Sequence, residues 1–274
     1  MADGQTRSKW RAFWERGGWW RALLLAVVYL VLYEVLSLAF IPLAREIKNP
    51  QGPAAVLVDY VLPIAVGSVL LVGFALSVGW MRELFGRQPV HGRAWMWIAV
   101  AVVLLFNVLR FATIDYSEVS AALVATWLLA GVFIGFAEEL LTRGIVVKLL
   151  RTCGYREIVV AVVSSAIFAG LHSANLLNGQ SLLATLLQLV YTFAFGVCMY
   201  LALRVSGTII VPMLLHASTD PSIFLQAAHP AEGALASIAD LGNFAVIIAG
   251  LVLLVFIRGR VPAPASQFRP EDPA

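Results

Sequence analysis

The chain has 274 residues, of which 61% are hydrophobic and only 13% are charged, and its mean hydropathy is +0.87. A soluble domain of this length does not keep so apolar a surface in water, so the composition excludes a soluble enzyme or binding module and indicates a polytopic membrane protein. The formal net charge of +3 is informative through its distribution among the loops, not as a sign of an acidic partner.

The amino-terminal residues 1–18 are rich in basic and aromatic side chains and are predicted to form a cytoplasmic tail. Trp10, Trp14, Trp19 and Trp20 stand beside these bases, as in the aromatic belts that anchor a segment at the lipid headgroups. The apolar run that follows lacks a convincing small-residue cleavage site. We therefore expect it to remain attached as the first span.

About twenty apolar residues cross the hydrocarbon core of a bilayer, and eight segments of this chain reach that length. The predicted spans are 19–44, 54–79, 94–114, 119–148, 157–173, 181–203, 208–226 and 240–257. The fifth is short, and Asp220-Pro221 interrupts the seventh. The sequence thus predicts an all-α polytopic membrane helical bundle of about eight transmembrane helices, with one transmembrane domain over residues 19–258.

The loop charges predict the orientation, because cytoplasmic loops are rich in Lys and Arg. Of the 19 basic residues, 15 fall in the amino-terminal tail, the even-numbered loops and the carboxyl-terminal tail. Arg45, Lys48 and Arg110 lie on the opposite side, and Arg143 lies within a span. Both termini are therefore predicted to be cytoplasmic, in a multi-pass protein of the plasma or inner membrane. The Pro-rich, polar residues 259–274 are predicted to form a disordered cytoplasmic tail.

The fourth span contains three formal charges, Glu138, Glu139 and Arg143. A charge at the centre of a membrane helix costs roughly 2.5–3.5 kcal/mol on insertion scales, so such residues require partners or water and mark a functional site by default. Glu139 and Arg143 are four apart and share a helical face, whereas Glu138 and Arg143 do not. A buried ion pair that only fixes helix packing would account for Glu139 and Arg143. It leaves Glu138 unexplained.

Two later spans each place a histidine four residues from a second notable side chain. Phe168 and His172 end the fifth span, and His216 and Asp220 lie in the seventh. At about 1.5 Å of rise per residue, these groups and Glu138 fall within one slab of the membrane. A single histidine at a helix end is usually a satisfied core residue. A carboxylate, two imidazoles and a second acid at one depth are the groups needed to activate water and stabilise charge.

These three motifs, Glu138-Glu139-x-x-x-Arg143, Phe168-x-x-x-His172 and His216-x-x-x-Asp220, occur in this order on three of the predicted spans. Together they resemble the CPBP intramembrane proteases, which include the CAAX prenyl endopeptidases and the bacterial Abi-type proteins. The resemblance covers about residues 119–226. Each motif alone is weak, but the three at helical spacing in one polytopic chain are fairly specific.

The resemblance implies an intramembrane endopeptidase in which Glu138 and His172 activate the water that attacks a peptide bond. His216 and Asp220 would hold the oxyanion, and Glu139, Arg143 and Phe168 would support the site. Some family members carry asparagine at the position of Asp220. An aspartate can replace it as a protonated acid, or by holding His216 as a charged donor. The implied partners are the lipid bilayer and a peptide or protein substrate, of which prenylated CAAX tails are one kind. No nucleic acid is expected.

Other polar residues carry less weight. Glu34 in the first span and Asp59 in the second either line the cavity or form a pair near an interface. Asn175, three residues after His172, either caps that helix end or contacts substrate.

Two functions of other classes stay open at this stage. Intramembrane Glu and His chains also mark ion pathways, so a transporter or proton relay is one alternative, although the two halves of the chain show no repeat. A non-catalytic membrane scaffold or immunity protein of the same family is the other.

No cofactor is expected, with zinc as the alternative, because Glu138, His172 and His216 could serve as three ligands with an open fourth position. The spacing lacks the HExxH pattern, and the resemblance implies direct activation of water without a metal. Cys153 and Cys198 form no CxxC motif and are interpreted as structural.

Overall fold

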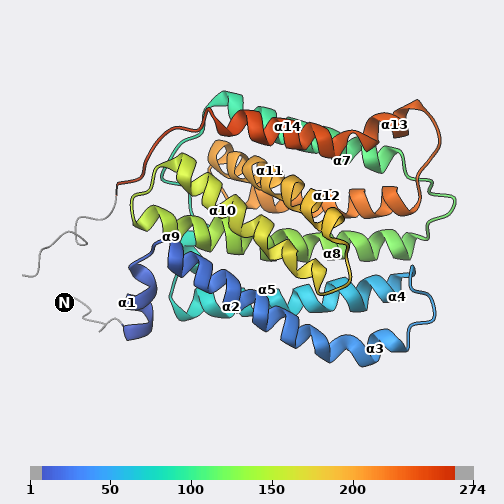
Figure 1. The fold of residues 1–274 in the computed structure, drawn as a ribbon, viewed down its shortest axis with the longest axis horizontal. Helices are drawn as coiled ribbons and strands as arrows, with labels where there is room; N and C mark the ends of the chain where they lie inside the picture. Colours follow the sequence, from blue (N-terminus) through green and yellow to red (C-terminus); the bar gives the residue numbers. More distant parts are fainter. Residues whose placement is uncertain (1–7, 263–274) are drawn as a thin grey trace, which may run out of the picture.

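The computed structural model describes residues 8–262 as a bundle of long helices lying side by side (Figure 1). Within residues 8–262, seven helices are long and apolar enough to cross a membrane, namely Trp19–Arg45, Pro53–Ser77, Ala94–Ala112, Ala121–Thr152, Glu157–Leu176, Leu182–Ser206 and Ala234–Leu254. The remaining predicted span, the seventh, is α12 (Ile210–Ala228), which has the length but carries the polar run from His216 to Asp220. The prediction of an all-α polytopic bundle is confirmed.

Several spans are composite helices. The first joins α2 (Trp19–Ser37), η1 (Leu38–Phe40) and α3 (Ile41–Arg45), and the second joins α4 (Pro53–Val56), η2 (Leu57–Val61) and α5 (Leu62–Ser77). The third is η3 (Ala94–Met96) with α7 (Trp97–Ala112). The fourth joins α8 (Ala121–Glu139), η4 (Leu140–Val146) and α9 (Val147–Thr152). The fifth is α10 (Glu157–Leu171) with η5 (His172–Leu176), the sixth is α11 (Leu182–Ser206), and the last is α13 (Ala234–Asp240) with α14 (Gly242–Leu254).

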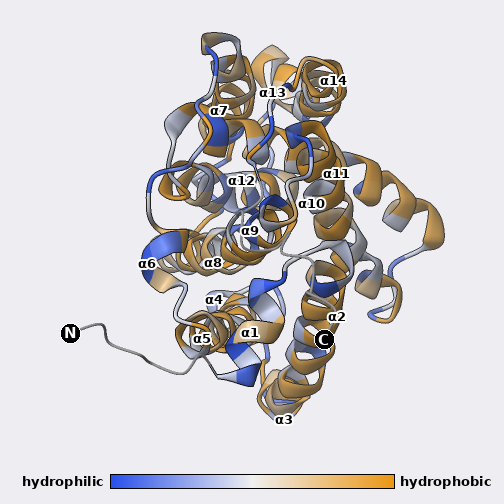
Figure 2. Ribbon diagram, turned by 90° about the vertical axis from the view of Figure 1, so that its left-hand side faces the viewer, coloured by the Kyte–Doolittle hydropathy of each residue, from blue (hydrophilic) through white to orange (hydrophobic). Residues whose placement is uncertain are grey.

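The helices pack in successive layers across the bundle. α2 packs on α5, α5 on α8, and α8 on α12. α7 and α14 close the other side against α12 and α11 (Figure 1). Viewed along the helix axes, hydrophobic residues make up most of the helices, and hydrophilic ones concentrate at the helix ends and in the loops (Figure 2). The exposed apolar side chains, such as Leu187 and Phe244, are those expected to meet lipid.

The short helices α1 (Lys9–Glu15) and α6 (Met81–Leu84) lie at the end of the bundle that faces the viewer in Figure 2. We call it the basic end, because the basic loops 82–93 and 148–156 lie there. Trp14 of α1 is buried, and the Trp10 indole Nε1–H donates to Ser77 Oγ at 3.0 Å. Part of the predicted amino-terminal tail is therefore packed against the bundle. The predicted disorder of residues 259–274 falls mostly on 263–274, which lie outside the described residues, as do residues 1–7 of the tail.

The interruption predicted at Asp220-Pro221 is wrong, because α12 continues through Pro221 to Ala228. Proline lacks an N–H and so leaves the carbonyl four residues earlier, that of Ala217, without its usual partner. This carbonyl lies against Gly131 of α8, where an added Cβ would come within 2.2 Å of Ala217 O. Close backbone contact with α8, in which Cα–H groups can approach the carbonyl, accommodates the proline.

Gly131 and Gly135 of α8 allow this close approach. A Cβ on Gly135 would lie 2.5 Å from Met213 O and 2.8 Å from Ala217 N. Small residues four apart on one face let two membrane helices pack backbone to backbone. The pair therefore fixes α12 against α8 just before Glu138, and this brings the third motif, His216 and Asp220, to the first.

Candidate active site

The first motif lies where α8 passes into the π-helical turn η4. Glu138 and Glu139 are the last residues of α8, and wide turns of this kind recur at functional sites. Thr142 Oγ1 donates to the carbonyl oxygen of Glu138 at 2.5 Å, and the Arg143 guanidinium donates to the same hydroxyl. Arg143 Nε lies 3.3 Å from Glu139 Oε2, so the predicted Glu139–Arg143 ion pair is confirmed.

His216 joins the two glutamates. Its Nδ1 lies 2.8 Å from Glu139 Oε1, and its Nε2 lies 3.5 Å from Glu138 Oε2 and 3.8 Å from Asp220 Oδ2. A carboxylate only accepts hydrogen bonds, so Nδ1 carries a proton and donates it to Glu139. The carboxylate of Glu139 therefore holds the ring so that Nε2 is directed at the two carboxylates of Glu138 and Asp220.

Aromatic rings enclose the charged pair and the imidazole. The Arg143 guanidinium carbon lies 4.7 Å from the centre of the Phe168 ring, a cation–π geometry. The ring of Phe195 meets that of His216 edge-on at 4.8 Å, and the ring of Phe168 does so at 5.8 Å. Phe168 thus supports Arg143 and His216 together. Phe195 was not predicted from the sequence, because a phenylalanine in an apolar helix carries no signal of its own.

His172 directly follows α10 and lies four residues after Phe168, the helical spacing that the sequence indicated. Its Nδ1 is 3.0 Å from the carbonyl oxygen of Phe168, which accepts a hydrogen bond from it. The proton on Nδ1 leaves Nε2 as an acceptor. The rings of Phe168 and His172 meet edge-on at 5.0 Å.

Two cavities meet at this cluster. The larger, of about 600 Å³, is lined by Glu138, His172 and Asp220. The smaller, of about 140 Å³, is lined by Glu138, His172 and Glu34. The structure therefore brings Glu138, His172 and Asp220 together around one hollow, with the buried His216 next to Glu138 and Asp220.

Exposure divides the charged residues of the site into two sets. The side chains of Glu138 and Asp220 are 23% and 25% exposed, whereas those of Glu139 and Arg143 are 0% exposed. The first two face space that a substrate or water can enter, and the last two are enclosed by protein. This separates Glu138 from its neighbour as the helical spacing predicted.

The remaining residues singled out in the sequence are also placed. Glu34 lines the smaller cavity, and Asp59 is exposed on η2. The side-chain NH2 of Asn175 donates to Gln188 Oε1 at 2.8 Å, and both residues line the larger cavity. Tyr33 lines both cavities. Gln188 and Tyr33 were missed, although their polarity within a span is a signal that could have indicated them.

The side chains that could bind a metal ion are His, Cys, Asp and Glu. Over residues 8–262, no three His, Cys, Asp or Glu side chains are grouped so that they could hold a metal ion. Cys198 is buried in α11, and Cys153 lies at the basic end.

Comparison with known families identifies the segment that contains these residues. Residues 120–221 match the family model described as type II CAAX prenyl endopeptidase Rce1-like. This part of the chain is therefore similar to the CAAX-type intramembrane proteases that the three motifs resemble. The matched segment includes all three motifs, from Glu138 to Asp220. The apolar helices support an integral membrane protein, and the match relates its residues 120–221 to a family of peptidases. No individual curated protein matches the chain.

Proposed function

We propose that the protein is an intramembrane endopeptidase that hydrolyses a peptide bond with a water molecule activated by Glu138 and His172. The observation that carries this proposal is the cavity of about 600 Å³ that Glu138, His172 and Asp220 line together. A carboxylate and an imidazole acceptor facing one hollow are suited to hold a water molecule and to take its proton.

Each residue of the site has its own role in the proposed reaction. The Glu138 carboxylate takes a proton from the water as its oxygen bonds to the carbonyl carbon of the scissile peptide, and His172 Nε2 accepts a hydrogen bond from the same water. The negative charge that forms on the carbonyl oxygen is stabilised from the side of His216 and Asp220. Glu138 then returns its proton to the leaving amine as the carbon–nitrogen bond breaks.

Asp220 does not supply the amide donor that asparagine offers at this position in some family members. The carboxylates of Glu138, Glu139 and Asp220 surround the His216 ring at 2.8–3.8 Å. Opposite charges at such distances favour an imidazolium, which would donate from Nε2 to the oxyanion. This arrangement supports Asp220 as the residue that holds His216 as a charged donor.

Purified protein in proteoliposomes tests the proposal against transport. Incubation with a peptide library, followed by mass spectrometry, is expected to reveal cleaved peptides with the wild type and none with Glu138→Gln, while ion flux stays at the level of empty liposomes. Flux that depends on Glu138, without cleavage, would instead establish a transporter or proton relay. CAAX-type processing of a carboxyl-terminal segment is the finer form of the proposal, and prenylated peptides in the library would reveal it.

A further inference from the structure

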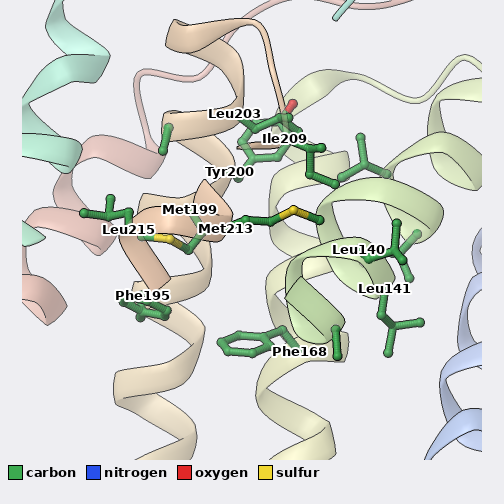
Figure 3. Close-up of a cluster of buried hydrophobic side chains, with 14 of the residues drawn as sticks. Leu140, Leu141, Phe168, Phe195, Met199, Tyr200, Leu203, Ile209, Met213 and Leu215 are labelled. Carbon is green, nitrogen blue, oxygen red and sulfur yellow. The ribbon is translucent and has the colours of Figure 1, made fainter. Parts of the chain in front are cut away.

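The bundle is tightly packed on one side of the candidate site. We call the part between Glu139 and the basic loops the basic half. Its apolar side chains lie on the helical turns that lead from the site to those loops, and Figure 3 shows them interdigitating. They are Leu140, Leu141, Met199, Tyr200, Leu203, Ile209, Met213 and Leu215. None of them is more than 7% exposed. None of these side chains lines the cavity that Glu138, His172 and Asp220 share, so that cavity does not extend through this core toward the basic end.

A buried charge cluster lies further out in the basic half. Glu157 accepts from Arg151 Nη2 at 2.7 Å, from Arg204 Nη1 at 3.0 Å and from the Tyr200 hydroxyl. The Glu157 backbone N–H also donates to Gly259 O at 3.0 Å. The segment after α14 is thereby fastened over the end of the bundle, and the cluster involves α9, α10 and α11 together.

The other side of the site is open. We call the part that contains the cavity of about 600 Å³ the open half. Its walls come from the ends of α11, α12 and α14 that are distant from the basic loops. Several wall residues are well exposed, including Leu187 at 63%, Val190 at 49% and Phe244 at 67%. The cavity therefore communicates with the surroundings along this wall, between α11 and α14.

The wall combines apolar and polar groups. Ile223, Phe224 and Ile247 offer apolar surface, while Gln188, Tyr191 and Asn243 carry polar groups. The Tyr191 hydroxyl is buried and has no hydrogen-bond partner among the described residues. An unpaired buried hydroxyl costs free energy unless a ligand pairs with it. A backbone N–H or C=O of an extended peptide is such a ligand.

We propose that the substrate reaches Glu138 through the open half, as an extended peptide segment that enters between α11 and α14 from the side opposite the basic loops. With the basic loops cytoplasmic, this is the extracytoplasmic leaflet. The substrate class is then a membrane-associated polypeptide whose cleavage site has apolar neighbours and lies toward that leaflet. The identity of the occupant as substrate rests on the proposed function, whereas the side of access rests on the two halves alone.

Cysteine labelling in intact cells tests the side of access without requiring activity. Ile223→Cys, in a Cys153→Ser background, places a thiol in the cavity wall one turn beyond Asp220. Ile248→Cys is the matched control, because Ile248 is 63% exposed but lies outside the cavity wall. Native Cys153 marks the basic end, and Cys198 is fully buried. The probe is a membrane-impermeant maleimide, applied before and after permeabilisation.

We expect Ile223→Cys to react from the side opposite Cys153, on the order of tenfold faster than Ile248→Cys, because the reactive thiolate requires water. Ile247→Cys, on α14, should behave in the same way and serves if Ile223→Cys fails to fold. A cavity thiol that reacts only from the side of Cys153, or from neither side, overturns the proposal. If labelling is as expected but Glu138→Gln changes no cleavage, the proposed function fails while the side of access stands.

Discussion

The two halves of the bundle both bury charge, but they treat it differently. In the basic half, the carboxylate of Glu157 receives hydrogen bonds from two arginines and a tyrosine. In the site, the Glu138 carboxylate has His216 Nε2 at 3.5 Å and otherwise faces a cavity. A buried charge whose hydrogen bonds are satisfied by protein holds helices together. A charge left open to a hollow is available for chemistry.

The largest expected effect separates these two roles at Glu138. Glu138→Gln should abolish cleavage and leave thermal unfolding in detergent unchanged, because the amide keeps the shape but cannot take a proton from water. Activity on a peptide reporter and thermal denaturation of the same preparation would be measured together. A large loss of thermal stability would mean that Glu138 belongs with Glu157 as a structural charge.

The second effect concerns Asp220, which lies 3.8 Å from His216 Nε2. Asp220→Ala should lower the rate by roughly a hundredfold, comparable to the loss of an oxyanion donor, whereas Asp220→Asn should retain substantial cleavage. A pH–rate profile of the three proteins checks both statements, and the Asn variant should lose part of the fall in activity at high pH. If the Asn variant is as inactive as the Ala variant, Asp220 acts as a base or ligand and the oxyanion role must be dropped.

The third effect is expected at Glu139, which contacts both Arg143 and His216. Glu139→Gln leaves Arg143 buried without its ionic partner, and breaking a buried pair costs roughly 3–5 kcal/mol. Yield and melting temperature should therefore fall, and the remaining folded protein should retain some cleavage. Normal stability together with a complete loss of cleavage would instead place Glu139 among the residues that act on the substrate.

Glu157→Gln makes the matching change in the basic half. It removes one carboxylate charge from between Arg151 and Arg204, so the melting temperature should fall as it does for Glu139→Gln. The cleavage rate of the folded fraction should stay within about twofold of the wild type. The side-chain partners of Glu157 are Arg151, Tyr200 and Arg204, and residues that share no partner usually act independently. An equal loss of rate in the Glu139 and Glu157 variants would remove the distinction between the two halves.

The smallest effect is expected from metal removal. Dialysis of active protein against a chelator should leave cleavage unchanged, because Glu138 itself activates the water in this account. Elemental analysis of the same sample completes the test. Stoichiometric zinc, with activity lost to the chelator and restored by zinc, would assign Glu138, His172 and His216 as ligands instead.

The sequence was sufficient for the features that depend on local spacing. Apolar length predicted the spans, and the four-residue separations predicted the Glu139–Arg143 pair and the shared helical face on which Phe168 and His172 meet edge-on. The bond between His216 and Glu139 could not be predicted, because it depends on how α12 lies against α8. Gly131 and Gly135 set that approach, but their effect becomes visible only when the partner helix is known.

Pro221 shows a second limit of local reasoning. A proline in a polar stretch usually ends a helix, yet α12 continues because α8 packs against the carbonyl that the proline frees. The difference between the two halves is also a tertiary property, since Leu140 and Ile134 are equally apolar in sequence. One lies in the packed core and the other lines the cavity.

Peptide termini in native membranes test the central claim most directly. Membranes of cells that produce the wild type, Glu138→Gln or Glu157→Gln would be compared by quantitative mass spectrometry of new amino and carboxyl termini. The account predicts a set of termini that is present with the wild type and Glu157→Gln, is absent with Glu138→Gln, and maps to the leaflet opposite the basic loops. Identical termini in all three membranes, at equal amounts of folded protein, would contradict it.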